Sequence, residues 1–484
     1  MKDLLAIGVG AVGATIFWMG TSCRPTAPAR GELTTIHIAP PPTVEPPVAL
    51  VPEPPPPPTG PQLLEVPPGA LDPLYATLAL AEAGDPAGRA DLLFFGDSHT
   101  AGDLLTGYLR RSLQAKFGDA GRGFVLAGHP PIKYYTQRDI TCASTGRWTA
   151  EQGGKRHASE PFGMAGVRVH SDDKSAVAWV ESCAGCKTGG EVDRFDVYYL
   201  RTKGSGALGY KVDDGDWHKV ATKLEPPVVA SATDVSVGGP VGDEVAATLT
   251  VPVDPGHHKI SLRPQGGGPV ELFGVALERN RPGVLVDSLG VVGRRLAHLF
   301  HWDWSVIGPQ LAQRDPALVV IQYGTNEADD PDLELDTLAR QYDAVIARVR
   351  EHAPRAAILL LGPPDMAVRT GGKACDRRPP PAPSADGTPG ALDPDCQWRT
   401  PAVLPQIVEV ERLAARRNRV AFFDTFTALG GADRMDEFFH QEPSLAYGDH
   451  VHFTDKGYQR WGQALLEQLL AGYDQWKLRA PSPR

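Results

Sequence analysis

The chain has 484 residues, which is long enough for two or three domains whose cores need no disulfide or metal for stability. Apolar residues make up 42% of the sequence, which excludes a chain that is disordered as a whole. The formal net charge is −10 and no basic stripe stands out, which argues against nucleic acid as the main partner.

The N-terminus carries an uncharged apolar run at residues 4–20, just before Cys23. Its length is typical of an export signal and slightly short for a membrane span of about 20 residues. The small residues before Cys23 resemble a bacterial lipoprotein signal, in which residues 1–23 direct export and Cys23 is lipidated. The alternative is an uncleaved anchor helix. Both interpretations predict an extracytoplasmic, periplasmic protein attached to the membrane.

Residues 24–84 are expected to form a disordered linker. Proline is abundant between residues 25 and 68, and residues 54–58 are an unbroken proline run. Proline lacks the amide donor of a strand ladder and favours the extended polyproline II conformation. We therefore expect a semi-rigid spacer that lets a globular body reach through a layer such as a cell wall.

Strand and helix signals alternate in two separate stretches, residues 85–128 and residues 283–478. The expected strands are short buried runs, at residues 91–95, 317–322, 356–361 and 420–423. The expected helices begin at Asp103, with Gly118 as a stop, and lie at residues 333–352, 403–417 and 454–473. This alternation predicts an α/β fold with a mostly parallel sheet that helices cover on both faces.

The middle of the chain, residues 129–282, has a different pattern. Short strand-like segments separated by turn signals lie at residues 166–170, 176–180, 195–200, 246–251, 259–263 and 269–277. Asp214 and Gly215 indicate a tight hairpin, and no helical periodicity competes. The pattern predicts a β-sandwich inserted into the α/β domain.

An exported protein can form disulfides, because its compartment is oxidising. Cys375 and Cys396 flank a stretch rich in proline, glycine and aspartate, and we predict a disulfide that closes this loop. Cys183 and Cys186 form a C-x-x-C pattern. A redox pair or half of a zinc site are alternatives, but no second C-x-x-C is present, which favours a structural hairpin disulfide. Cys142 has no assigned partner.

A serine lies where the first expected strand meets its helix. Residues 94–99 place Ser98 at the carboxyl end of the sheet, where ligands of open α/β sheets bind. Free amides at the start of a helix suit a developing oxyanion, and the Asp97 side chain can accept hydrogen bonds from the turn. Taken alone, Gly-Asp-Ser is better explained as a turn without chemistry. Other segments of the sequence must therefore decide between a turn and a catalytic serine.

Two further segments supply polar groups suited to ester chemistry. Asn326 follows the strand expected at residues 317–322, so it can converge with Ser98 and donate its side-chain N–H to an oxyanion; alone, it would be a turn or cap residue. Asp449 and His452 lie three residues apart in a loop, where the acid can orient the imidazole as a base. A metal site that adds His450 is the alternative, but no further ligand cluster is evident.

These segments, in this order, resemble the SGNH hydrolase superfamily, also called GDSL-type esterases. The blocks of the superfamily match residues 96–98 (Gly-Asp-Ser), 324–326 (Gly-x-Asn) and 449–452 (Asp-x-x-His). The second block falls in residues 287–293 and contributes an oxyanion-hole glycine, for which Gly293 is favoured and Gly290 is the fallback. The resemblance covers the whole α/β part and implies a flavodoxin-like, three-layer sandwich.

The resemblance also implies a role for each residue. Ser98 attacks an ester carbonyl, His452 takes and returns the proton, and Asp449 holds His452. The amides of Ser98 and Gly293 and the side chain of Asn326 form the oxyanion hole. No metal or organic cofactor is implied.

A narrower similarity is to bacterial peptidoglycan O-acetylesterases. It is carried by residues 96–103, 113–124, 287–293, 323–328 and 362–365. Those enzymes carry a β-rich insertion, similar to a carbohydrate-binding module, in the same place, which implies a jelly-roll-like fold for residues 129–282. The proline-rich stretch 377–394 departs from the pattern and leaves the exact substrate open.

The expected activity is hydrolysis of O-acetyl groups on a cell-wall glycan, with peptidoglycan favoured. The expected partners are an O-acetylated polysaccharide and a membrane bound through the N-terminal lipid or anchor. Alternatives are an acetyltransferase acting on a polysaccharide and a non-catalytic wall-binding lipoprotein, although the intact set of Ser, Asn, Asp and His argues against the latter. A lipase is less favoured because no long apolar lid segment is apparent.

Overall fold

The computed structural model describes residues 62–130, 132, 135–154, 161–224, 244–370 and 397–479. The N-terminal apolar run, Cys23, most of the expected spacer, and the cysteines at 375 and 396 lie outside these residues, so the predictions about them stay predictions. In the described ranges, no helix has the length and apolar content needed to cross a bilayer.

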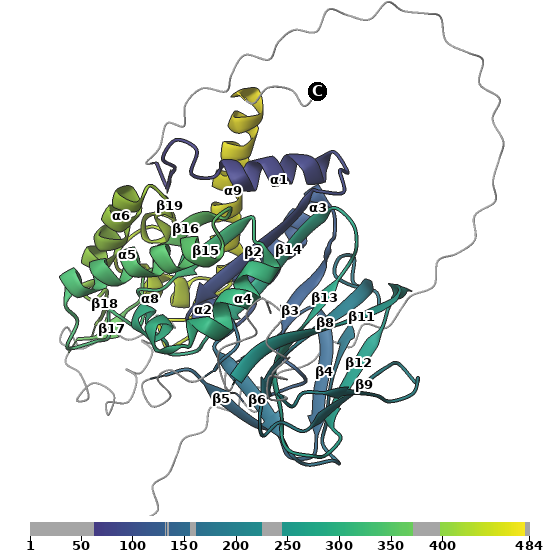
Figure 1. Ribbon diagram of the computed structural model, residues 1–484. Coiled ribbons are helices and arrows are strands. Elements are labelled where there is room, and N and C mark those ends of the chain that lie inside the picture. Colours follow the sequence, from purple (N-terminus) through teal and green to yellow (C-terminus); the bar gives the residue numbers. More distant parts are fainter. Residues whose placement is uncertain are drawn as a thin grey trace, which may run out of the picture. The chain divides into compact units, whose positions relative to one another are not determined.

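A six-stranded sheet forms the centre of the α/β part, with the strand order β1-β19-β16-β15-β2-β14 (Figure 1). Its strands are β1 (Leu64–Glu65), β2 (Arg89–Gly96), β14 (Gly283–Gly290), β15 (Leu318–Gln322), β16 (Ala357–Leu361) and β19 (Ala421–Phe423). All neighbours pair in parallel except β1, which is antiparallel to β19. The four predicted strands correspond to β2, β15, β16 and β19.

Helices cover both faces of this sheet, and alternate strand residues belong to two separate cores. Leu93 and Phe95 of β2 join the core beneath α4 (Trp304–Arg314), α5 (Leu335–His352) and α6 (Leu404–Asn418). Leu92 and Phe94 join the core beneath α1 (Asp72–Glu82), α3 (Leu105–Phe117) and α9 (Asp455–Arg479). Because a strand buried on both faces reads as an unbroken apolar run, the sequence pattern located these strands. The α/β fold has three layers.

The predicted linker is wrong for residues 64–82. They form β1 and α1, with Leu64 paired to Phe423 and Leu74 and Leu78 buried. The prolines around them obscured this signal, but Pro73 occupies the first turn of α1, where a missing amide donor costs nothing. The last part of the expected linker therefore belongs to the α/β domain.

The inserted part consists of antiparallel strands in two sheets. One has the order β10-β9-β12-β7-β4, and the other has the order β11-β8-β13-β6-β5, with β3 also paired to β13. The strands are β3 (Gly121–Val125), β4 (Ile140–Thr145), β5 (Thr149–Gln152), β6 (Val167–Ser171), β7 (Val177–Ser182), β8 (Val192–Thr202), β9 (Ala207–Val212), β10 (His218–Ala221), β11 (Glu244–Gly256), β12 (Lys259–Pro264) and β13 (Val270–Glu278). Val180 and Val197, from different sheets, share one buried core.

Buried charges join the inserted sheets to the α/β sheet. The Arg314 side chain, at the end of α4, pairs with Glu278 of β13, with Asp91 of β2 and with Asp287 of β14 (2.7 Å). These side chains are at most 3% exposed. Burial would raise the pKa of Glu278, but Arg314, Arg89 and Arg194 together hold it at about 2. Glu278 therefore stays ionised beside the guanidinium groups, whereas burial raises the pKa of Asp91 well above its ordinary value despite the nearby Arg314.

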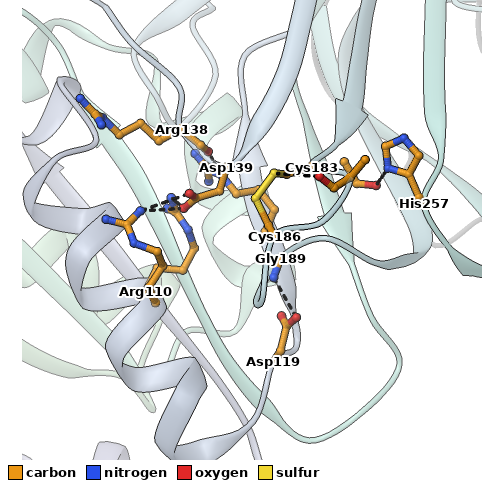
Figure 2. The surroundings of a disulfide bond; sticks show 12 residues. Arg110, Asp119, Arg138, Asp139, Cys183, Cys186, Gly189 and His257 are labelled. Carbon is orange, nitrogen blue, oxygen red and sulfur yellow. Dashed lines mark hydrogen bonds and ion pairs between the residues drawn. A yellow bond between two sulfur atoms is a disulfide. The ribbon is translucent and has the colours of Figure 1, made fainter. Parts of the chain in front are cut away.

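The C-x-x-C pair forms the predicted short disulfide, between Cys183 and Cys186 (Figure 2). It closes the turn after β7, and three residues later the Gly189 amide donates a hydrogen bond to Asp119, 2.8 Å away, just before β3. The disulfide thus stiffens a loop that contacts the α/β part. Cys142 in β4 is a free thiol.

Candidate active site

Ser98 lies in the turn between β2 and the short helix α2 (Ser98–Ala101). The Asp97 side chain caps this helix by accepting a hydrogen bond from the His99 amide (2.9 Å). Gly96 is required here because a Cβ would lie 2.2 Å from the Thr100 hydroxyl oxygen. The turn therefore presents Ser98, half-buried, at the carboxyl end of β2, which is the predicted position.

Ser98, His452 and Asp449 form one continuous line of hydrogen bonds. The His452 Nε2 atom lies 2.8 Å from Ser98 Oγ, and its Nδ1 atom lies 2.7 Å from Asp449 Oδ2. The other Asp449 oxygen accepts the amides of Val451 (3.0 Å) and His452 (2.9 Å). With Nδ1–H donating to the carboxylate, Nε2 is left to accept the serine proton. The arrangement suits a nucleophile with an oriented base.

The charges of this line favour a neutral serine beside a basic imidazole. Burial would raise the pKa of Asp449, but the side-chain and amide hydrogen bonds from His452 and the Val451 amide bring it to about 2. Burial alone would lower the pKa of His452, but the hydrogen bond and charge of Asp449, with the charge of Asp97, raise it above its ordinary value. Asp449 is therefore a carboxylate that strengthens His452 as a proton acceptor.

His450, the third member of the alternative metal site, points elsewhere. Its Nε2 atom lies 3.0 Å from Asp436 Oδ1, and its ring stacks on Trp398 with centroids 3.8 Å apart. The ranges that the structure describes contain no group of three or more His, Cys, Asp or Glu side chains placed to hold a metal ion. His450 instead anchors the loop that carries Asp449 and His452.

Asn326 is joined to the loop that carries Gly293. The Asn326 Nδ2 atom donates to the Arg294 carbonyl (3.1 Å). Gly293 is exposed and has a φ of +70°, and a Cβ added there would meet no atom within 4 Å. Gly290 is buried in β14, and a Cβ there would lie 2.3 Å from the Ala101 amide nitrogen. Only Gly293 of these two glycines therefore faces open space beside Asn326.

Sequence reasoning missed the residues that hold the Asn326 loop. The Glu327 carboxylate accepts the amides of Gly324 (2.9 Å) and Leu296 (2.6 Å), so it ties the loop after β15 to the loop after β14. The Arg295 Nε atom donates to the Asn326 carbonyl (2.9 Å). The only sequence signal for these contacts was the presence of charged residues next to Gly293 and Asn326. This signal is weak because charged side chains usually face the solvent.

His99 was also missed as part of the site, although it adjoins the serine. It is buried, its ring centroid lies 5.4 Å from that of His452, and its Nδ1 atom lies 2.9 Å from the Tyr458 hydroxyl. Burial and the nearby His452 hold the pKa of His99 well below its ordinary value. A neutral His99 therefore packs beside His452 without competing for its proton.

Comparison with known families matches a stretch of the chain that contains part of this site. Residues 242–460 match the family model of GDSL-like lipases and acylhydrolases. The chain carries a GDSL-like lipase/acylhydrolase domain. The match includes Asn326, Asp449 and His452 of the GDSL-like domain, and it begins just before β11, so Ser98 precedes it.

The GDSL-like domain and the inserted sheets together share their fold with a solved structure of a peptidoglycan O-acetylesterase. That structure is 20% identical, the match covers 85% of this chain and 99% of that chain, and the TM-score is 0.63. Two family two carbohydrate esterases match less well. The one from Clostridium thermocellum is 12% identical (67% of this chain, 98% of that chain, TM-score 0.26). The one from Cellvibrio japonicus is 11% identical (68% and 99%, TM-score 0.25). No curated protein matches the chain.

Proposed function

We propose that this protein is a serine esterase that removes O-acetyl groups from a cell-wall glycan. The observation that carries the proposal is the hydrogen-bond line from Ser98 through His452 to Asp449, at the strand ends of a GDSL-like acylhydrolase domain. Ser98 is the nucleophile, His452 is the general base and acid, and Asp449 orients His452.

The reaction has two halves. Ser98 Oγ attacks the acetyl carbonyl while His452 Nε2 takes its proton, and the tetrahedral oxyanion is held by the amides of Ser98 and Gly293 and by Asn326 Nδ2. The intermediate then collapses to an acetyl-enzyme, and His452 returns the proton to the leaving sugar hydroxyl. Water repeats the sequence, releasing acetate and regenerating Ser98. The chemistry calls on no metal or organic cofactor.

Several observations support a glycan as the substrate. The solved structure with the same fold is a peptidoglycan O-acetylesterase, and the two antiparallel sheets lie where a carbohydrate-binding, jelly-roll-like module was expected. The expected lipid anchor at Cys23 and the proline-rich spacer suit an extracytoplasmic enzyme tethered near the wall. We favour peptidoglycan, and hydrolysis over acetyl transfer to a second polysaccharide.

The test is to incubate the purified protein with O-acetylated peptidoglycan and to measure released acetate. Activated esters of two-, four- and eight-carbon acids are compared in parallel, and we expect the two-carbon ester to be cleaved fastest. Faster cleavage of the eight-carbon ester, with no acetate from the wall, would favour a lipase. Loss of wall acetyl without equivalent free acetate, and acetyl gained by an added unacetylated glycan, would favour a transferase.

A further inference from the structure

We propose that Arg294 is a positioning residue through which the inserted β-sheets hold the oxyanion side of the active site. The inference rests on the proposed function of Asn326 and Gly293 as oxyanion donors, and it extends that function to the insertion. In this view the insertion acts on the chemical step itself, for small esters as well as for polymers.

The main chain of Arg294 lies between the two proposed donors. Arg294 directly follows Gly293, and its carbonyl oxygen accepts the hydrogen bond from Asn326 Nδ2 at 3.1 Å. The Gly293 amide belongs to the peptide that joins residues 292 and 293, and the Arg294 carbonyl belongs to the peptide that joins residues 294 and 295. These two peptides flank the same pair of residues, so a shift of this segment moves the Gly293 amide and, through the hydrogen bond, the Asn326 side chain relative to Ser98.

The side chain of Arg294 reaches the insertion. Its Nε atom donates to the carbonyl oxygen of Gly153 at 2.6 Å, immediately after β5, and 141 residues separate the two partners in sequence. Gly153 is itself fixed, because its amide donates to the Gly166 carbonyl (2.9 Å) just before β6. Hydrogen bonds from a guanidinium are charge-assisted and directional. In the described residues Arg294 forms no ion pair, so the Gly153 carbonyl is its anchor.

Trp302, at the far end of the same loop, packs against the same two glycines. A Cβ at Gly153 would lie 2.0 Å from Trp302 Nε1, and a Cβ at Gly166 would lie 2.4 Å from Trp302 Cζ2. Trp302 is buried at 3% exposure. The segment from Gly293 to Trp302 therefore contacts the insertion near both of its ends, and these contacts restrict its movement. This close fit allows the insertion to fix the position of the Arg294 main chain.

Arg295 provides the contrast within the loop. Its side chain pairs with Asp330 and donates to the Asn326 carbonyl, so it fastens the loop to the α/β domain alone. Arg294 is the neighbour that faces the insertion. Arg294 thus fastens this loop to the insertion, and Arg295 fastens it to the α/β domain. Asn326 is hydrogen-bonded to the Arg294 carbonyl and to the Arg295 side chain.

The experiment measures kcat and KM of Arg294→Met and Arg294→Lys on a small activated acetyl ester. We expect kcat to fall by about tenfold to a hundredfold with KM little changed, because a slightly misplaced donor weakens transition-state binding more than substrate binding. Lysine keeps the charge but has no Nε–H in the guanidinium position, so it should lose activity in the same direction. If the methionine variant folds poorly, the kcat of the lysine variant tests the proposal.

A double-mutant cycle with Asn326→Ala separates positioning from general stabilisation. If Arg294 acts through Asn326, the combined loss in kcat is at least about threefold smaller than the product of the two single losses. Independent, multiplicative losses would overturn the inference, as would an unchanged kcat in both Arg294 variants.

The matched control is Arg279→Met. Arg279, at the end of the insertion, pairs with Asp119 (3.3 Å) and with Glu191, and neither partner belongs to the segment from Gly293 to Trp302. We expect its kcat to stay within about twofold of the wild type. A fall equal to that of Arg294→Met would mean that any loosening of the insertion has the same effect, and would overturn the specific role of Arg294. The assay uses a small ester. If the enzyme released no acetate from the cell wall, the glycan proposal would be contradicted, but the role of Arg294 would still be tested.

Discussion

The side chains of Asp97 and Asn326 are in contact, with Oδ2 and Nδ2 3.4 Å apart although 229 residues separate them in sequence. Asp97 also caps α2, so the residue before the proposed nucleophile contacts both Ser98's helix and the proposed oxyanion donor. Burial raises the pKa of Asp97 to about 7. The first and third sequence blocks are therefore joined by a polar contact in the interior.

Replacing Ser98 with alanine should abolish turnover of an activated acetyl ester, with a loss of about 10⁴-fold or more, because no other hydroxyl accompanies His452 Nε2 in the described residues. The fold should persist, since Ser98 Oγ hydrogen bonds only to His452 in the described chain. Circular dichroism and melting temperature provide the control. Near wild-type turnover in a folded variant would remove Ser98 from the mechanism.

His452→Ala should cause a loss similar to that of Ser98→Ala, whereas His450→Ala should be much milder for catalysis. His450 anchors its loop through Asp436 and Trp398, so its replacement should mainly lower thermal stability. The measurement is kcat on the acetyl ester, with melting temperature beside it. A reversed order of the two activities would mean that the wrong histidine has been assigned as the base.

The pH dependence of kcat/KM should have an acid limb set by His452. The imidazole must be neutral to accept the serine proton, so activity is lost as the pH falls through the raised pKa of His452. Asp449→Asn removes the negative charge that stabilises the imidazolium, so it should lower this pKa and move the limb to lower pH. The plateau should fall by about 10⁴-fold. Profiles of both proteins test this, and a limb at the same pH in both would contradict the assignment.

The two glycines of the second block should respond differently to substitution by alanine. Gly290→Ala places a Cβ against the Ala101 amide, between β14 and α2, and should lower the melting temperature. Gly293→Ala meets no neighbour but must adopt a φ of +70°, so it should lower kcat with a smaller effect on stability. If Gly290→Ala were stable and inactive, Gly290 would be the better candidate for the oxyanion donor.

The sequence was sufficient for β2, β15, β16 and β19, but it did not predict β14, although that strand is also buried along its whole length. The apolar run before Ser98 predicted β2, and the motifs after β2 and β15 are at the sheet edge where they were expected. It was insufficient for α1, because prolines surround the helix and only the first turn tolerates one inside it. It also missed α4, which carries Pro309 within an amphipathic stretch.

Contacts between distant segments were beyond the sequence for a different reason. The Arg294–Gly153 hydrogen bond joins a loop to a turn after a four-residue strand, and neither partner has a motif. The sequence favoured Gly293 over Gly290 through the family resemblance alone, and the packing of Gly290 against the Ala101 amide supplies the physical reason. A single sequence read by itself gives no signal for such pairs.

The ion pairs of Arg314 affect how the protein unfolds. Glu278 belongs to the insertion, Asp91 and Asp287 belong to the central sheet, and the Arg314 guanidinium pairs with all three. Separating the two parts would strand charges in apolar surroundings, which is unfavourable enough to make partial opening rare. We therefore expect one calorimetric transition for the described body, with no intermediate in which one part is molten and the other native. Excising the insertion should then weaken the hydrolase scaffold as well, because the two share a single cooperative folding unit.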